Sequence, residues 1–217
     1  MCVFCENQQG RYLECSNGTI NRIILEDQYW AIMPTLGAFV EGYVLHVLKR
    51  HTQASYFCSK NEIDSLEDNI TAIHDTYKRT YGTEYACIFE HGAIKEEYKS
   101  ACCINHTHIH MLPSKYDVYE DVTKYLKVDR IEVSTLAECY EIIRHSNMSS
   151  YIMFGNPILA KYSIVNTSEN VCPSQYLRQV LYKILVGSSL DYGWDWRKNF
   201  YYDVIKKTVF DLRQTLN

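Results

Sequence analysis

The clearest periodic pattern lies between Asn61 and Tyr81, where apolar side chains recur at steps of three and four residues. That spacing places them on one stripe of an α-helix. Acidic residues dominate the early part of the segment and basic residues its last turn, as the helix dipole favours. Gly82 follows directly, and glycine commonly ends helices. The sequence therefore predicts an amphipathic helix whose apolar stripe consists of Ile63, Leu66, Ile70, Ile73 and Tyr77.

Short apolar segments on both sides of this helix have the length and residue types of β-strands. Before the helix, they predict a hairpin that turns at Asp27-Gln28, followed by a third strand. After the helix, a further strand runs into Glu90-His91-Gly92. The four predicted strands span residues 22–26, 29–33, 43–48 and 85–89.

The second half of the chain mixes both kinds of element. Ser134 to His145 begins like a capped helix, a second helix begins at Pro173 with proline in its first turn, and Asn199 to Leu216 predicts a long closing helix. Two strands, 151–155 and 159–165, flank a turn at Asn156-Pro157. The whole chain is therefore predicted to be α+β. We divide it into residues 1–116 and 117–217, and expect the two parts to pack together because no low-complexity linker separates them.

Three histidines, His106, His108 and His110, occur at a strict spacing of two residues. In a β-strand this spacing places alternate side chains on one face. His106 and His110 would then lie roughly 13 Å apart, too far to share one metal ion whose bonds to nitrogen are about 2.0 Å long. The row could instead supply an imidazole nucleophile for phosphorus, with neighbouring groups that orient it and stabilise charge. The alternative is a surface strand with chance histidines, but the following Met111-Leu112-Pro113 is typical of a buried strand end.

Composition limits the class of protein. The chain has 217 residues, 47% of them hydrophobic, which is enough for a real core. It carries a net charge of −4, so no broad basic field favours nucleic acid. No apolar run reaches the ~18 residues of a membrane span. Nine cysteines without a secretory signal indicate reduced thiols in a cytoplasmic protein.

The run from His106 to Leu112 resembles the motif of the histidine-triad (HIT) family, His-x-His-x-His followed by two apolar residues, with a threonine at the first x. The resemblance extends from Cys2 to about Pro113. It implies a HIT-like antiparallel sheet with helices. It further implies that His108 attacks the α-phosphorus of a nucleotide to form a nucleotidyl-histidine, which water or another acceptor resolves. His106 and His110 would orient its ring or carry a proton.

The same resemblance implies a zinc site. Cys2 and Cys5 form a C-x2-C pair, which alone is weak evidence, and Gly42 to His51 resembles a glycine, strand, basic pair and histidine segment of the family. In zinc-binding members the corresponding residues form one tetrahedral site, which maps here onto Cys2, Cys5, His51 and His106. The alternative is that His51 caps a strand while both cysteines stay reduced without a metal.

Three positions depart from common members of the family. Thr35 falls where many carry an acidic residue for the ribose hydroxyls, and Tyr43 where many carry a phosphate-contacting histidine. Cys103 stands where many place a serine or threonine, and a thiol is a poorer donor. Thr35 and Tyr43 still permit nucleotide binding, but they remove the usual ribose and phosphate contacts.

Four further residues are candidates for substrate contact. Glu90 and His91 end a strand that opens towards the site, unless this corner is only a turn stabilised by Gly92. Gln175 and Arg178, on the first turn of the helix predicted from Pro173, could meet a phosphate. The second half resembles C-terminal extensions of longer HIT-related proteins, including the CwfJ-like group. In the structural alternative, Asp195 and Arg197 pair and pack beside the tryptophans.

The sequence is compatible with three functions. The first is a nucleotidyl hydrolase or transferase on nucleoside phosphates or dinucleoside polyphosphates. The second is a nucleotide-binding or adaptor protein with little turnover, and the third a metal-dependent hydrolase that uses the histidines as ligands. Dimers are common in the family, so a homodimer is also to be considered, although the second half could replace or block its interface.

Overall fold

The computed structural model describes residues 2, 4–5, 10–15, 18–95, 104–168, 173–187 and 192–216. Its strands are β1 Tyr12–Cys15, β2 Gly18–Asn21, β3 Leu25–Glu26, β4 Trp30–Pro34, β5 Val44–Leu48, β6 Tyr85–Ala93, β7 His108–Ser114, β8 Ile131–Val133, β9 Ser150–Asn156 and β10 Lys161–Asn166. The helices are α1 Lys60–Tyr81, α2 Tyr119–Leu126, α3 Leu136–His145, α4 Tyr176–Val186 and α5 Tyr202–Leu216, and a short 3-10 helix covers Ser55–Phe57.

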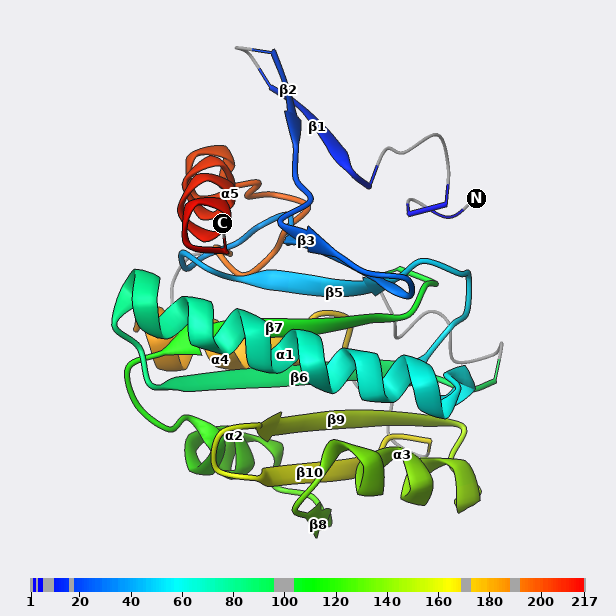
Figure 1. Ribbon diagram of the computed structural model, residues 1–217. Coiled ribbons are helices and arrows are strands. Elements are labelled where there is room, and N and C mark those ends of the chain that lie inside the picture. The colour runs from blue at the N-terminus through cyan, green and yellow to red at the C-terminus, as the bar shows by residue number, and fades with distance from the viewer. Residues whose placement is uncertain are drawn as a thin grey trace.

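Eight strands form one antiparallel sheet in the order β3-β4-β5-β7-β6-β9-β10-β8, and β1 and β2 form a separate hairpin that projects from it (Figure 1). The α+β prediction is confirmed. Strand β9 pairs along β6 from Ile88 opposite Gly155 to Ala93 opposite Ser150. Strands from both sides of residue 116 therefore belong to the same sheet. The division into two domains at that residue stays a prediction.

Helix α1 follows from its sequence at both ends and along its length. Ser59 caps it in a reciprocal arrangement with Glu62, and Gly82 ends it in the left-handed conformation with φ of 62°. The five residues of the predicted apolar stripe are at most 3% exposed. Each such burial contributes about 1.5–3 kcal/mol, so this stripe fixes α1 on the sheet.

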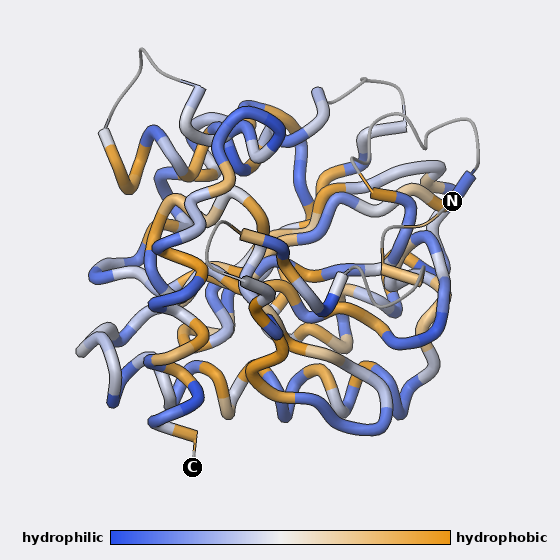
Figure 2. The backbone as a smooth tube through the Cα atoms, turned by 90° about the horizontal axis from the view of Figure 1, so that it is seen from above, coloured by the Kyte–Doolittle hydropathy of each residue, from blue (hydrophilic) through white to orange (hydrophobic). Residues whose placement is uncertain are grey.

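The two larger hydrophobic cores lie on opposite faces of the sheet. One lies between the sheet and helices α1 and α3, and the other between the opposite face and α2 and α4. Because strand side chains alternate, Ile88, Ile109 and Met111 enter the first core. Phe89 and Leu112 enter the second. Figure 2 shows hydrophobic segments running through the interior and hydrophilic segments over much of the periphery.

Several predicted boundaries were wrong. Strand β7 begins at His108, so His106 lies in the bend before the strand rather than in line with the other two histidines. Helix α4 begins at Tyr176, because Gln175 is its N-cap with φ of 64° and Pro173 precedes the helix. Helix α5 begins at Tyr202, three residues later than predicted. Neither α2 nor the β1–β2 hairpin was predicted. In the part of the chain that the structure describes, no helix is both long and apolar enough to cross a bilayer.

Candidate active site and metal cluster

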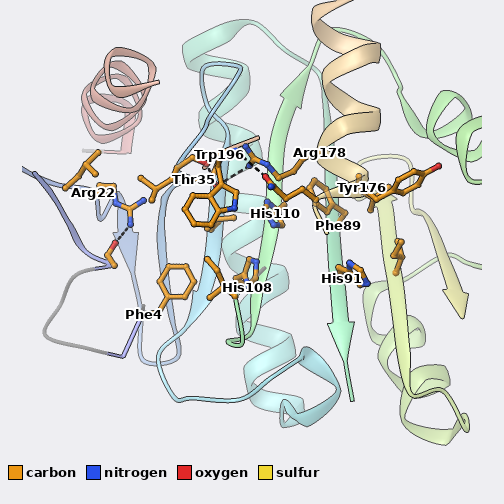
Figure 3. A pocket seen from close by; sticks show the side chains of 18 of the residues that line it. Phe4, Arg22, Thr35, Phe89, His91, His108, His110, Tyr176, Arg178 and Trp196 are labelled. Carbon is orange, nitrogen blue, oxygen red and sulfur yellow. Dashed lines mark hydrogen bonds between the residues drawn. The ribbon is translucent and has the colours of Figure 1, made fainter. Parts of the chain in front are cut away.

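A cavity of about 130 Å³ opens on the α4 side of the sheet. Its walls come from distant parts of the chain: the N-terminal segment, strands β5 to β7, and the residues around α4 (Figure 3). The lining is mostly apolar and aromatic, with a few polar groups. Apart from tyrosines, the polar or charged residues that line it within the described ranges are Arg22, Thr35, His91, His108, His110, Gln175 and Arg178.

His108 presents one ring nitrogen to this cavity. Its Nδ1 lies 2.6 Å from the carbonyl oxygen of His106. Because a carbonyl can only accept, Nδ1 carries the proton and the lone pair resides on Nε2. Burial lowers the pKa of His108 to about 4, and the nearby charge of Arg178 contributes in the same direction. The ring is therefore neutral at pH 7, with an unprotonated Nε2 available as a nucleophile.

His110 stands beside it in a fixed orientation. Its ring stacks on Phe89 with centroids 4.3 Å apart and planes 3° apart. The Tyr43 hydroxyl lies 2.9 Å from His110 Nδ1. Burial lowers the pKa of His110 well below its ordinary value, with smaller contributions from His108 and Arg178. Tyr43 is fully buried, so it orients His110 from behind the cavity.

Replacing Tyr43 with phenylalanine tests this arrangement. We expect kcat to fall about three- to tenfold, the size of one lost hydrogen bond, with little change in KM. Tyr77→Phe is the matched control, because it also removes a buried hydroxyl, one that donates to the carbonyl of Gly42. The control should lower stability without changing kcat, and an equal loss of kcat in both variants would refute the assignment.

Arg178 reaches the site from α4. Its Nε donates to the carbonyl of Trp194 at 3.1 Å and its Nη2 to the carbonyl of Gly37 at 2.6 Å. Its guanidinium carbon lies 5.2 Å from the centre of the Tyr43 ring. Gly37 has a φ of 70°, and a Cβ there would lie 2.6 Å from Trp196. Only glycine therefore lets this turn approach Arg178 and Trp196 so closely.

Gln175 lines the cavity, but its side-chain amide is engaged within the protein. Its Nε2 donates to Asp195 Oδ1 at 2.9 Å, and its Oε1 accepts from the backbone nitrogen of Trp196 at 3.2 Å. Thr35 is similarly engaged, because its hydroxyl donates to the carbonyl of Leu36 at 3.1 Å. Both residues therefore shape the wall around Trp196 and Arg178. His91 also lines the cavity, and burial lowers its pKa to about 4.

Glu90, predicted to touch substrate, lies on the opposite face of β6 from His91 and is absent from the cavity lining. Its carboxylate accepts from the Ser55 backbone nitrogen at 2.8 Å and from the Tyr151 hydroxyl at 2.7 Å. Strand alternation places neighbouring residues on opposite faces, and here Glu90 points towards the core under α3. Burial raises the pKa of Glu90 to about 7.

This raised pKa predicts a pH dependence of stability. An unfolded chain releases the Glu90 proton near pH 4.5, whereas the folded chain holds it to about pH 7. The free energy of unfolding should therefore fall as the pH rises from 4.5 to 7, by roughly 3 kcal/mol from this group. Glu90→Gln should remove this part of the pH dependence of the free energy of unfolding, as measured by denaturant titrations at several pH values. It should leave nucleotide affinity unchanged. A Glu90→Gln variant whose stability depends on pH as in the wild type, or whose nucleotide binding is weakened, would contradict the position of Glu90 in the core.

The four predicted metal ligands lie together in the structure. One donor atom from each of Cys2, Cys5, His51 and His106 lies within 4.8 Å of the others. His106 Nδ1 is 3.3 Å from Cys2 Sγ and 3.2 Å from His51 Nδ1, and Cys5 Sγ is 3.3 Å from His51 Nδ1. A tetrahedral zinc ion with ordinary bond lengths separates its sulfur and nitrogen ligands by roughly 3.6 Å and two nitrogens by roughly 3.3 Å. The donor set therefore fits zinc in both chemistry and spacing.

A further contact prepares His106 for this role. Its Nε2 lies 2.6 Å from the carbonyl oxygen of Leu48, so Nε2 donates and Nδ1 keeps its lone pair for a metal. Of the three histidines of the motif, only His106 joins the cluster. The metal-dependent alternative in which the histidines act together as ligands therefore has no support in the described geometry.

Phe4 connects the cluster to the cavity. It lies between the two cysteines in sequence, lines the cavity, and its ring centre is 5.4 Å from that of His106 and 6.0 Å from that of His108. No motif or periodicity in the sequence indicated this role of Phe4 or the cavity contacts of Arg22. Cys103 lies outside the described residues.

No family model matches the chain, and no curated protein sequence matches it significantly. Histidine-triad proteins are among its structural neighbours. A zinc-bound histidine triad family protein from Mycobacterium smegmatis is 17% identical, with a TM-score of 0.38 over 52% of this chain and 73% of that one. A HIT family protein from Bacillus anthracis is 18% identical, with a TM-score of 0.40 over 54% and 74%.

Yeast Ap4A phosphorylase in complex with Ap4A is 11% identical, with a TM-score of 0.45 over 75% of this chain and 62% of that one. The CwfJ-like resemblance of the second half stays a prediction.

Proposed function

We propose that the protein is a nucleotidyl hydrolase or transferase in which His108 forms a covalent bond to the α-phosphorus of a nucleotide. The observation that carries this proposal is the fixed tautomer of His108: Nδ1 is tied to the carbonyl of His106, and the ring lines the cavity with Nε2 unprotonated. A neutral, oriented imidazole in a concave site is the arrangement that nucleophilic catalysis requires.

The first step transfers the nucleotidyl group to the protein. The Nε2 lone pair forms a bond to phosphorus, the bond from phosphorus to the leaving group breaks, and its electron pair departs with that group. The ring then carries positive charge, which the carbonyl of His106 stabilises through Nδ1–H. In the second step, the oxygen of water or of another hydroxyl acceptor bonds to the same phosphorus and loses its proton to solvent. The phosphorus–nitrogen bond breaks, and its electron pair returns to Nε2 of His108.

Two groups support charge and orientation in these steps. Arg178 stands close enough that its charge lowers the pKa of both His108 and His110. A guanidinium at this distance would stabilise the charge on the equatorial phosphoryl oxygens. His110, fixed by Phe89 and Tyr43, would hold the phosphoryl group by a ring N–H.

The apolar part of the cavity would hold the nucleoside. Phe4 and Trp196 line it, and flat rings of this kind stack on bases. Since ligand pockets usually measure ~300–1,000 Å³, we expect the phosphate and the adjoining part of the nucleoside to fill the cavity, with the rest extending past the N-terminal wall.

Zinc would act outside this chemistry. Held by Cys2, Cys5, His51 and His106, it would supply a closed structural centre that fixes the N-terminal segment against the sheet. The protein's own residues then carry every step at phosphorus.

Turnover of defined substrates tests the proposal. The protein, its zinc content measured, is incubated with diadenosine tetraphosphate and with adenosine 5′-phosphoramidate, and the products are separated by chromatography. Release of AMP from either substrate, insensitive to brief treatment with a chelator, supports it. Tight nucleotide binding without product would favour the adaptor function instead, and loss of all activity on chelation, with the fold intact, would favour metal-dependent hydrolysis.

A further inference from the structure

Arg22 is a buried cation with no counter-ion among the residues that the structure describes. Its side chain lines the same cavity as His108 and is 3% exposed. Nη1 donates to the carbonyl of Pro34 at 2.9 Å and Nη2 to the carbonyl of Gly10, while Nε has no partner. Among the ion pairs within the described ranges, none involves Arg22. Burial lowers the pKa of Arg22 to about 10, so the group remains charged at neutral pH.

Such a charge is costly to keep in a folded protein. A guanidinium removed from water is normally compensated by a carboxylate, because backbone carbonyls supply only partial charge. Arg178 is a second buried guanidinium of this kind: it is 3% exposed and is bonded to carbonyls and a hydroxyl. No aspartate or glutamate occurs among the residues that line the cavity in the described part of the chain. Within the described residues, the site therefore holds two positive charges without a carboxylate partner.

The two guanidinium groups are anchored to the same turn. Arg22 Nη1 binds the carbonyl of Pro34 at 2.9 Å, and Arg178 Nη1 lies 3.4 Å from the hydroxyl of the next residue, Thr35. Since neighbouring Cα atoms are 3.8 Å apart, the two Nη1 atoms lie within roughly 12 Å of each other. In Figure 3, Thr35 and Trp196 lie between Arg22 and Arg178, and His110 and His108 lie beneath them in the view.

We propose that Arg22 forms a second anion subsite, so that the substrate is a nucleotide with at least two linked phosphoryl groups. The inference rests on the proposed function: Arg178 serves the phosphorus that His108 attacks, and Arg22 serves the phosphate beyond it. A diphosphate is long enough to reach both cations and brings one phosphoryl group to each.

This assignment specifies the leaving group. When the Nε2–phosphorus bond forms, the bond between that phosphorus and the bridging oxygen breaks, and the electron pair stays on the oxygen of the departing phosphate. A phosphate leaves as an anion without first taking up a proton, and Arg22 would stabilise the charge it gains. An amine leaving group would bring no negative charge to Arg22, so phosphoramidates should be poorer substrates.

Binding of two ligands that differ by one phosphate tests the subsite. The probes are AMP and α,β-methylene-ADP, whose carbon bridge prevents transfer, and calorimetry at fixed ionic strength gives each Kd. The wild type should bind α,β-methylene-ADP at least about tenfold more tightly than AMP, as expected for one charge-assisted contact. Arg22→Met should remove this preference and leave the Kd for AMP within about threefold of the wild type.

Arg11→Met is the matched control, because Arg11 carries the same charge on the same segment but pairs with Glu26. It should keep the preference. If Arg22→Met does not fold, Arg22→Lys and the wild-type comparison decide: the lysine variant keeps the charge and should keep part of the preference. Equal Kd values for the two ligands in the wild type, or an undiminished preference in Arg22→Met, would overturn the subsite while AMP binding and turnover stand. Failure to bind either ligand would instead remove the proposed function and, with it, this inference.

Discussion

Replacement of His108 by alanine is expected to lower kcat/KM for a cleavable nucleotide at least about a thousandfold, because the variant has no group to attack phosphorus. The two neighbouring rings cannot substitute for it. His106 has Nε2 bonded to the carbonyl of Leu48 and Nδ1 in the cysteine–histidine cluster. His110 is fixed against Phe89 with Nδ1 beside the Tyr43 hydroxyl.

The matched control for this variant is His145→Ala. His145 is a histidine on α3 whose side chain is 81% exposed and lies beside Glu141. Its removal should change neither kcat nor KM. Circular dichroism and the thermal midpoint of each variant establish that folding is retained. A His108→Ala variant that keeps a tenth or more of the wild-type rate would show that the nucleophile is another group.

Removal of the metal cluster should have the second large effect. In the double variant Cys2→Ala/Cys5→Ala, we expect loss of the bound zinc and a fall in the free energy of unfolding of several kcal/mol, since a structural zinc site contributes its binding energy to folding. Nucleotide affinity should also weaken about tenfold or more, because a hydrophobic contact of Phe4 and the position of the His106 carbonyl both depend on the cluster. Elemental analysis, denaturant unfolding and AMP titration measure the three quantities.

Cys15→Ala provides the control for the double variant. Cys15 lies on the β1–β2 hairpin, and its Sγ donates to the carbonyl of Gly18. It should retain one zinc ion per chain and the wild-type affinity for AMP. The role of the cluster would be refuted if the wild-type protein contained no zinc after expression in zinc-supplemented medium. It would also be refuted if the double variant had unchanged stability and AMP affinity.

Local sequence rules predicted most of the framework of this fold. The stripe and caps of α1 depend on residues close in sequence, so the pattern from Ile63 to Tyr77 and the position of Gly82 were sufficient. The hairpin at Asp27-Gln28 follows for the same reason. Element starts that depend on tertiary contacts were missed. Gln175, for example, adopts a left-handed N-cap conformation while its amide binds Asp195 and the Trp196 backbone.

In the candidate site, too, features set by local sequence were predictable and features set by tertiary contacts were not. The spacing of His108 and His110 placed both rings on one face of a strand, but His106 turns away to the cysteines because the strand begins only at His108. Alternation along β6 would have assigned Glu90 and His91 to opposite faces, and that signal was available. For Arg22 the sequence contained no such signal, because its partners are the backbone carbonyls of Gly10 and Pro34, which no side-chain pattern reveals.

The most direct test of the central claim is to locate the covalent intermediate. The protein is mixed with diadenosine tetraphosphate, quenched in alkali because a phosphoramidate is labile in acid, digested, and its peptides sequenced by mass spectrometry. The account predicts an adenylyl group on the peptide that contains residues 106–112, attached to His108. An adduct on any other residue would contradict the account. Complete turnover of the substrate would also contradict it if samples quenched within the first catalytic cycle contain no adduct.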